Sequence, residues 1–342
     1  MGPDAGAHLA VSAAALPDVP SDPAAHSFRA DRDRGGFGRS LRFGLRAARR
    51  SSPTRSDGRP DTDLNVPTPE EVQEAALYAL IHRGHRGDTA YYAKACKGAA
   101  AVLELGCGYG RLLPSLSRVA RRVTGIEAHA GLLAMAEVKR LSLPKATAKR
   151  VTLCQGDVTL ALPEGPFDRI VWPYNGLFCL ANREEKLAAL RHAREVSTDE
   201  ARLLFDVYVL DVDTEEAVIE DDFDYLISVL DEAGRLDVYE QNVESPGNVI
   251  TANYRFERLG DVPTPPLQSS VRHHYLRPAE LKPLLLESGW CLDEVYEDFR
   301  GTPTGDDPAL FVAGARPQRS RVFSGPRKSP LPISTPPARK RP

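Results

Sequence analysis

From residue 68 onward, the spacing of hydrophobic residues switches repeatedly between two periods. Short runs that are almost wholly apolar are typical of buried strands, and stretches whose apolar residues recur every three or four positions are typical of helices. The strands predicted up to residue 209 are 100–106, 122–128, 150–157, 167–175 and 201–209, and the helices are 68–84, 111–120, 130–143 and 183–197. This alternation predicts parallel strands joined by right-handed helical crossovers.

After residue 209 the pattern becomes that of an antiparallel insertion. Residues 235–243 and 249–259 alternate between apolar and polar positions and are joined by the sequence ESPGN, which favours a hairpin. Residues 269–277 alternate in the same way and predict a third strand, so the insertion is expected to span about residues 234–276. A sheet inserted at this point lies above the carboxyl ends of the parallel strands, where α/β proteins bind their ligands.

The end of the domain returns to the main sheet. A helix is predicted over 278–289, followed by strands over 290–299 and 309–316 that should join the parallel strands. The complete prediction is an α/β fold. It has a Rossmann-like, mostly parallel seven-stranded sheet with helices on both faces, and a small antiparallel β insertion after strand five.

Composition divides the 342-residue chain into three parts. Residues 1–67 are rich in Ala, Pro, Ser, Asp and Arg, and residues 316–342 hold eight Lys or Arg, many prolines and no acid, so both are predicted to be disordered. Residues 68–315 are expected to form one globular domain with 26 basic and 39 acidic residues, a net charge of −13. Because such a domain repels phosphate backbones, we expect no nucleic acid to bind to it.

The cysteine spacing and the hydropathy of the chain indicate the cellular compartment in which the protein is expected. The five cysteines are widely spaced, with no C-x-x-C pair and no matching histidine cluster, which favours a reducing compartment and no zinc site. No apolar run reaches 18 residues and no secretory signal is evident, so we expect no membrane span and a cytoplasmic protein. The arginines of residues 1–67 leave an organelle transit peptide open, and the sequence does not indicate the oligomeric state.

The stretch VLELGCGYGR, residues 102–111, carries the main chemical signal of the chain. A strand that ends in glycines before a helix brings backbone N–H groups and the helix dipole to one point, which suits an anionic or polar ligand. A dinucleotide would require G-x-G-x-x-G, but the third glycine, Gly110, comes one place early and Arg111 stands where it belongs. Gly106 and Gly108 allow a ligand to approach the backbone without an intervening side chain.

The turn resembles motif I of the class I S-adenosylmethionine-dependent methyltransferases, and three further positions are in register with that family. Glu127 ends the second predicted strand, where the family places an acid on the two ribose hydroxyls. Asp157, in QGD, ends the third strand, where the family's acid meets the adenine amino group, and residues 167–178 match the fourth-strand motif. Taken singly, Glu127 could instead be an ordinary strand-end acid and Asp157 a helix cap.

This resemblance covers about residues 75–315 and implies S-adenosyl-L-methionine as the cofactor. The cofactor-binding residues that it implies are Glu104, Gly106, Cys107, Gly108, Tyr109, Gly110, Glu127, Ala128, Asp157, Val158, Pro173 and Tyr92.

The resemblance is closest to enzymes with a small-molecule methyl acceptor. Residues 296–315 are similar to the C-terminal part of such enzymes, and residues 172–175 read Trp-Pro-Tyr-Asn, unlike the Asn/Asp-Pro-Pro-Tyr/Phe of DNA amino-methyltransferases. Methyl transfer requires an aligned acceptor that loses a proton. The candidate catalytic residues, above the fourth strand and in the insertion, are Tyr174, Asn175, His273, His274 and Tyr275. Adjacent histidines in a strand point to opposite faces, so at most one of the pair is expected to face the pocket.

Residues 82–92 lie where members of the family place a segment over the cofactor, so Tyr91 or Tyr92 could line the path of the methyl group. The alternative is an exposed polar loop followed by core tyrosines. No metal site is predicted, because Asn175 and Asp206 only loosely imitate the ligand set of metal-dependent methyltransferases. The predicted function is methyl transfer to N or O of a small molecule. The alternative is a non-catalytic protein of the same fold whose tails recruit partners, and a nicotinamide oxidoreductase is a more distant third.

Overall fold

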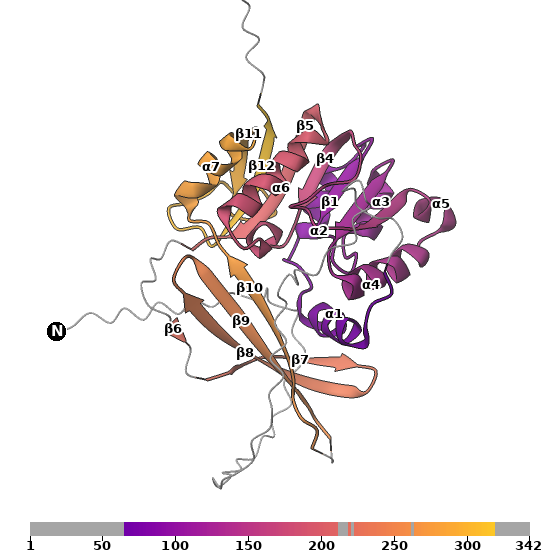
Figure 1. Ribbon diagram of the computed structural model, residues 1–342, viewed down its shortest axis with the longest axis vertical. Helices are drawn as coiled ribbons and strands as arrows, with labels where there is room; N and C mark the ends of the chain where they lie inside the picture. Colours follow the sequence, from indigo (N-terminus) through magenta and orange to yellow (C-terminus); the bar gives the residue numbers. More distant parts are fainter. Residues whose placement is uncertain (1–64, 211–217, 220–221, 261–262, 319–342) are drawn as a thin grey trace, which may run out of the picture.

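The computed structural model describes residues 65–210, 218–219, 222–260 and 263–318 (Figure 1). The predictions of disorder for residues 1–64 and 319–342 lie outside the described residues. Two units are visible in Figure 1: an α/β unit and an antiparallel sheet beside it, with α1 (Pro69–Ile81) near the junction.

The main sheet has seven strands in the order β11-β12-β5-β4-β1-β2-β3, which confirms the predicted α/β fold. The strands are β1 (Val102–Leu105), β2 (Val123–Glu127), β3 (Val151–Gln155), β4 (Phe167–Trp172), β5 (Ser197–Tyr208), β11 (Trp290–Tyr296) and β12 (Leu310–Pro317). The first five strands pair in parallel, and β12 is antiparallel to both β5 and β11. The carboxyl ends of the five parallel strands therefore meet at one edge of the sheet.

Helices cover both faces of the main sheet. Side chains of α6 (Arg183–Glu195) and α7 (Pro278–Glu287) are buried in the core on one face. Those of α2 (Asp88–Ala95), α3 (Leu113–Val119) and α4 (Ala130–Leu141) are buried in a second core cluster. Two short elements, α5 (Lys145–Ala148) and the 3-10 helix η1 (Gly176–Cys179), fill connections that the sequence pattern did not predict as helical.

The N-terminal helix begins as predicted but ends early. Thr68 caps α1: its hydroxyl accepts the Glu71 N–H at 3.2 Å, and the Glu71 carboxylate accepts the Thr68 N–H at 2.8 Å. The helix ends at Ile81 rather than at residue 84, and α2 follows where an exposed polar loop was one of the two predicted alternatives. Gly84 and Gly87 have φ of 85° and 93°, a conformation that glycine adopts without strain, and they turn the chain from α1 into α2.

Other boundaries also differ from the sequence pattern. The helix expected over 111–120 covers only Leu113–Val119, because Pro114 lies in its first turn, where proline favours the start of a helix. At the other end, β12 continues through Arg316 and Pro317, which pair with Cys291 and Trp290 of β11. The last strand therefore reaches into the segment predicted as a tail.

The antiparallel insertion is larger than the sequence pattern suggested. Its strands are β6 (Val218–Ile219), β7 (Asp224–Asp231), β8 (Gly234–Ser245), β9 (Val249–Arg258) and β10 (Leu267–His274), with the order β10-β9-β8-β6 and β7 paired to β8. It thus begins at Val218, before residue 234. Strand β7 has the sequence DYLISVLD, in which apolar and polar residues do not alternate regularly, and Val229 is the buried residue of this strand. The sequence pattern therefore did not predict it.

Helix α1 joins the insertion to the main domain. Leu77 of α1 is buried in a cluster with Val238 and Phe256 of the insertion. On another side α1 packs on α4, so closely that a Cβ on Gly131 would lie 2.1 Å from the Glu71 carbonyl oxygen. Tyr275, directly after β10, and Ile250 of β9 are buried in the core of the main sheet. The insertion is therefore anchored near the carboxyl ends of β4 and β5.

Candidate functional site

The glycine turn follows β1 and leaves open space over its backbone. Gly106, Gly108 and Gly110 have φ of 62°, 54° and 75°, a region that L side chains rarely adopt. A Cβ on Gly106 or Gly108 would meet no atom within 4 Å, whereas one on Gly110 would lie 2.7 Å from the Leu113 side chain. The first two glycines therefore border space that a ligand can fill, and the third packs against the following helix.

Two carboxylates follow the neighbouring strands β2 and β3. Glu127, at the end of β2, accepts the Gly108 N–H at 3.0 Å and the His129 N–H at 2.9 Å. Asp157 accepts the backbone N–H and the hydroxyl of Thr159 through Oδ1, at 2.8 and 2.7 Å, which leaves Oδ2 outside these two bonds. Glu127 thus contacts the glycine turn directly. Asp157 caps only a turn at residues 158–160 and not a helix, because the described residues between β3 and β4 form no helix.

Glu104 is an acid buried in the interior of β1. Its side chain is 2% exposed, and Oε2 has no hydrogen-bond partner among the described residues. Burial raises the pKa of this carboxyl to about 8, and the nearby Arg111 opposes that rise. Glu104 is therefore largely protonated at neutral pH.

We expect this proton to appear in the pH dependence of stability. Because the pKa of Glu104 is higher in the folded state than its ordinary value of 4.5, its contribution is fully present below pH 4.5 and is lost as the pH rises to about 8. Relative to Glu104→Gln, the wild-type free energy of unfolding should fall by at most about 1.4 kcal/mol per pH unit in that window. Urea unfolding across the window measures the difference. The exposed Glu200→Gln is the matched control, and a pH-independent difference between wild type and Glu104→Gln would contradict the assignment.

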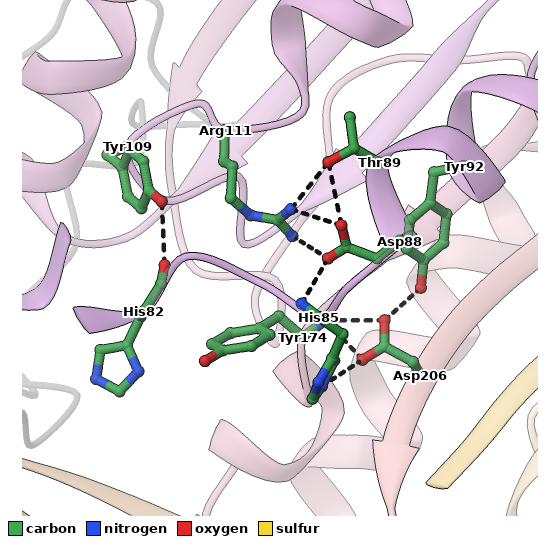
Figure 2. A network of polar contacts seen from close by, with 9 residues as sticks. All are labelled: His82, His85, Asp88, Thr89, Tyr92, Tyr109, Arg111, Tyr174 and Asp206. Carbon is green, nitrogen blue, oxygen red and sulfur yellow. Dashed lines mark hydrogen bonds and ion pairs between the residues drawn. The ribbon is translucent and has the colours of Figure 1, made fainter. Parts of the chain in front are cut away.

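The loop after β4 is held in an unusual conformation by β5. Tyr174 and Asn175 both have positive φ, 57° and 59°. Both carboxylate oxygens of Asp206, on β5, accept the Tyr174 N–H at 3.0 Å, and the Asn175 side-chain oxygen accepts the Tyr208 N–H at 2.8 Å. The Asn175 side chain is therefore engaged in fixing this loop, and the ring of Tyr174 lies beside His85 and Arg111 (Figure 2).

A polar network ties the segment before and within α2 to this loop (Figure 2). Asp88 is buried and binds Arg111 through two contacts, Nη1–Oδ1 at 2.9 Å and Nη2–Oδ2 at 2.7 Å, and it also accepts the His85 N–H at 3.0 Å. The Tyr92 hydroxyl donates to Asp206 at 2.5 Å. Arg111, which excluded a dinucleotide pattern, thus fastens the segment preceding the glycine turn onto that turn.

The sequence pattern missed His85 and Asp88 and did not anticipate that Asp206 is the centre of this network. Their signal was weak, because His85 and Asp88 lie in a short segment without a clear helix or strand pattern, and Asp206 lies more than a hundred residues further along the chain, within the strand predicted over 201–209.

The remaining residues of the predicted cofactor set are placed as follows. Cys107 is buried and its N–H donates to Ile126 at 3.0 Å, and the Tyr109 hydroxyl donates to the His82 carbonyl at 3.0 Å. Ala128 is exposed, Val158 is half-buried and Pro173 is buried. Tyr92 is fully buried, and Tyr91, half-buried, packs beside it with a ring separation of 5.3 Å.

The histidine pair of β10 is divided between two environments. His273 packs near Phe178 and Tyr208, with ring separations of 6.5 and 5.6 Å, and burial lowers its pKa to about 4. Burial also lowers the pKa of His274, but to a smaller extent. Tyr275 is buried, and its N–H donates to Asn248 at 2.9 Å.

Within the described residues, no three or more His, Cys, Asp or Glu side chains lie together as a group that could hold a metal ion. No helix in that part of the chain is long and apolar enough to span a membrane.

Comparison with known proteins connects this arrangement to one class of enzyme. A family model described as a methyltransferase domain matches residues 102–200, which contain the glycine turn, Glu127, Asp157 and the β4 loop. No curated protein sequence matches the chain.

Three solved structures share the fold. The CcbJ methyltransferase from Streptomyces caelestis is 22% identical with a TM-score of 0.55, and the match covers 77% of this chain and 94% of that one. CalS10 from Micromonospora echinaspora, an amino pentose methyltransferase solved with S-adenosylmethionine bound, is 19% identical with a TM-score of 0.54, covering 74% and 99%. An S-adenosylmethionine-dependent methyltransferase from Clostridium acetobutylicum is 13% identical with a TM-score of 0.57, covering 72% and 98%.

The sheet order and the glycine turn, together with these matches, define a class I methyltransferase fold. Residues 102–200 match the model of a methyltransferase domain, and the solved structures that share the fold include methyltransferases that depend on or bind the cofactor S-adenosylmethionine. The residues present fit this cofactor, because the open space over Gly106 and Gly108 and the unpartnered Oε2 of Glu104 leave room and a polar partner at the turn.

Proposed function

We propose that this enzyme transfers the methyl group of S-adenosylmethionine to a nitrogen or oxygen atom of a small molecule that binds beside the antiparallel insertion. The observation that carries the proposal is the glycine turn: open above Gly106 and Gly108, bonded to Glu127, and next to the β4 loop. In this site the cofactor supplies an electrophilic methyl group, and the chain's own residues bind it and orient the acceptor.

We assign the cofactor contacts by the roles that the family resemblance implies. The glycine turn lies along the methionine part, Glu127 accepts hydrogen bonds from the two ribose hydroxyls, and Asp157 accepts one from the adenine amino group. The positions of Glu127 and Asp157 after the neighbouring parallel strands β2 and β3 support these roles. We further propose that residues 68–315, including the insertion, form the catalytic unit.

An amino group is the first acceptor to test. The structure of CalS10, which shares this fold, is that of an amino pentose methyltransferase, and the net charge of −13 on residues 68–315 favours a cationic acceptor over a nucleic acid. The cytoplasm, where S-adenosylmethionine and small amines are available, is the proposed location.

The experiment uses the full chain with S-adenosylmethionine and a panel of amino sugars, each paired with the hydroxy sugar of the same skeleton. We expect a methylated product and S-adenosylhomocysteine, detected by mass spectrometry, with at least one amino sugar. Calorimetric titration with S-adenosylhomocysteine distinguishes the proposed enzyme from a non-catalytic protein of the same fold. The non-catalytic protein would bind S-adenosylhomocysteine and leave every member of the panel unmethylated.

A further inference from the structure

His85 and Asp206 form a pair that no sequence motif joins. His85 lies between α1 and α2, and its Nε2 is 3.6 Å from Oδ2 of Asp206 on β5. The Asp206 side chain is fully buried, and Nε2 of His85 is buried without a hydrogen-bond partner among the described residues. The carboxylate is therefore the group that this nitrogen faces, as Figure 2 shows.

The surroundings of His85 are aromatic and only partly open to solvent. Its ring centroid lies 5.0 Å from that of Tyr174 and 5.8 Å from that of Phe299, and its side chain is 21% exposed. Tyr174 follows β4 and Asp206 lies near the end of β5, so the imidazole is at the ligand-binding edge of the sheet. It is accessible to a ligand while most of the surrounding water is excluded.

Of the two acidic groups in contact with His85, one faces its ring and the other binds its backbone. Asp206 faces it from β5, while Asp88 of α2 accepts its backbone N–H and has its charge paired with Arg111 after the glycine turn. Tyr92 and Tyr174 are the other titratable groups of the network, and burial raises the pKa of both, so they stay neutral. Asp206 is thus the carboxyl of this network that faces the imidazole ring, and unlike Asp88 it is not paired with Arg111; burial raises its pKa, and its hydrogen bonds with the Tyr92 hydroxyl and the Tyr174 N–H oppose that rise.

Two other histidines, His82 and His273, are kept neutral by burial. Burial lowers the pKa of His82 to about 3 and that of His273 to about 4. His82 is also enclosed by aromatic rings, with Tyr78 at 4.2 Å and Tyr254 at 5.3 Å. Neither of these two histidines faces a carboxylate in the way that His85 does.

We propose that His85, oriented by Asp206, accepts the proton that the methyl acceptor releases. This inference rests on the proposed function. With the Nε2–H directed at Asp206, the lone pair of the other ring nitrogen, Nδ1, takes a proton from the acceptor's ammonium group or hydroxyl. The pair becomes imidazolium and carboxylate, the acceptor keeps the electron pair of the broken N–H or O–H bond, and the proton returns to solvent after the product leaves. Asp206 is a positioning residue in this scheme.

The first test determines which ring nitrogen of His85 carries the hydrogen, and it requires no methyl acceptor. The full chain with ¹⁵N-labelled histidine is saturated with S-adenosylhomocysteine, and the His85 ring nitrogens are assigned by the signals lost in His85→Asn. We expect the neutral ring to carry its hydrogen on Nε2 in the wild type and to lose this preference in Asp206→Asn. A hydrogen on Nδ1 in the wild type would overturn the proposal, whether or not any acceptor is methylated.

The second test uses the panel amine that the wild type methylates. In His85→Ala the methylation rate should fall by about a hundredfold or more with little change in KM, and added imidazole should restore part of it. His192→Ala, on α6, serves as the control, for which imidazole should change nothing. A wild-type rate in His85→Ala, or a loss that imidazole does not restore while S-adenosylhomocysteine still binds, would overturn the proposal. Binding of that ligand without methylation by the wild type would refute the proposed function alone.

Discussion

Replacing Glu127 by alanine should weaken the binding of S-adenosylhomocysteine by about ten- to a hundredfold. A hydrogen bond to a charged group contributes about 1.5 to 3 kcal/mol, so the expected loss of affinity corresponds to a net loss of one of the two that Glu127 is proposed to accept from the ribose. The same carboxylate accepts the N–H groups of Gly108 and His129, so its loss also loosens the glycine turn. Calorimetric titration of the full chain measures the effect.

Two further variants make this test specific. Glu127→Gln keeps one acceptor oxygen of similar reach and should lose less affinity than Glu127→Ala. Glu137→Ala removes a glutamate of α4 whose carboxylate is engaged by Arg140 at 2.6 Å, away from the glycine turn, so this variant should bind with the affinity of the wild type. An affinity for Glu127→Ala within about twofold of the wild type would show that the ribose is held elsewhere.

Replacing Asp206 by alanine should lower the free energy of unfolding by about 2 to 4 kcal/mol, because it leaves buried donors without an acceptor. The Tyr92 hydroxyl and the Tyr174 N–H both donate to this carboxylate. They lie on α2 and on the loop after β4, so the variant should also separate the two segments. Urea unfolding measures the loss of stability, and proteolysis within residues 82–92 is expected to become faster.

The matched control is Asp199→Ala, on the same strand. The Asp199 side chain is 94% exposed and pairs with Arg194 at 3.1 Å, so its removal should change stability by no more than about 0.5 kcal/mol. If Asp206→Ala were as stable as this control, the network would not hold α2 and the β4 loop together. Asp206→Asn keeps an acceptor oxygen for Tyr174 and should lose less stability than the alanine variant.

Much of the fold could be predicted because its signals are local. The apolar runs of β1 to β5 are almost completely buried in the sheet, and Thr68 and Glu71 form a capping box within four consecutive residues. The two strands after α7 also join the main sheet as predicted. Each of these features depends on neighbours in sequence, which a single chain displays directly.

Features that depend on distant partners were missed. Strand β7 pairs with β8 although its own residues barely alternate, and α2 forms within a stretch that was equally compatible with a polar loop. Tyr174 and Asn175 adopt positive φ because Asp206 and Tyr208, more than thirty residues away, hold their loop. Cross-strand pairing and long-range hydrogen bonds leave little trace in the local pattern.

The sequence by itself determined the seven strands of the main sheet, the glycine turn and the acids at the ends of β2 and β3. The physical reason is that hydrophobic period and glycine conformation are local properties of the chain. Only the tertiary structure decided that Arg111 binds Asp88, that His85 faces Asp206, and that the insertion packs against α1. These contacts join segments up to about 180 residues apart. The two carboxylate contacts form because burial leaves a carboxylate few partners other than those the fold brings to it, and the insertion packs against α1 through buried apolar side chains.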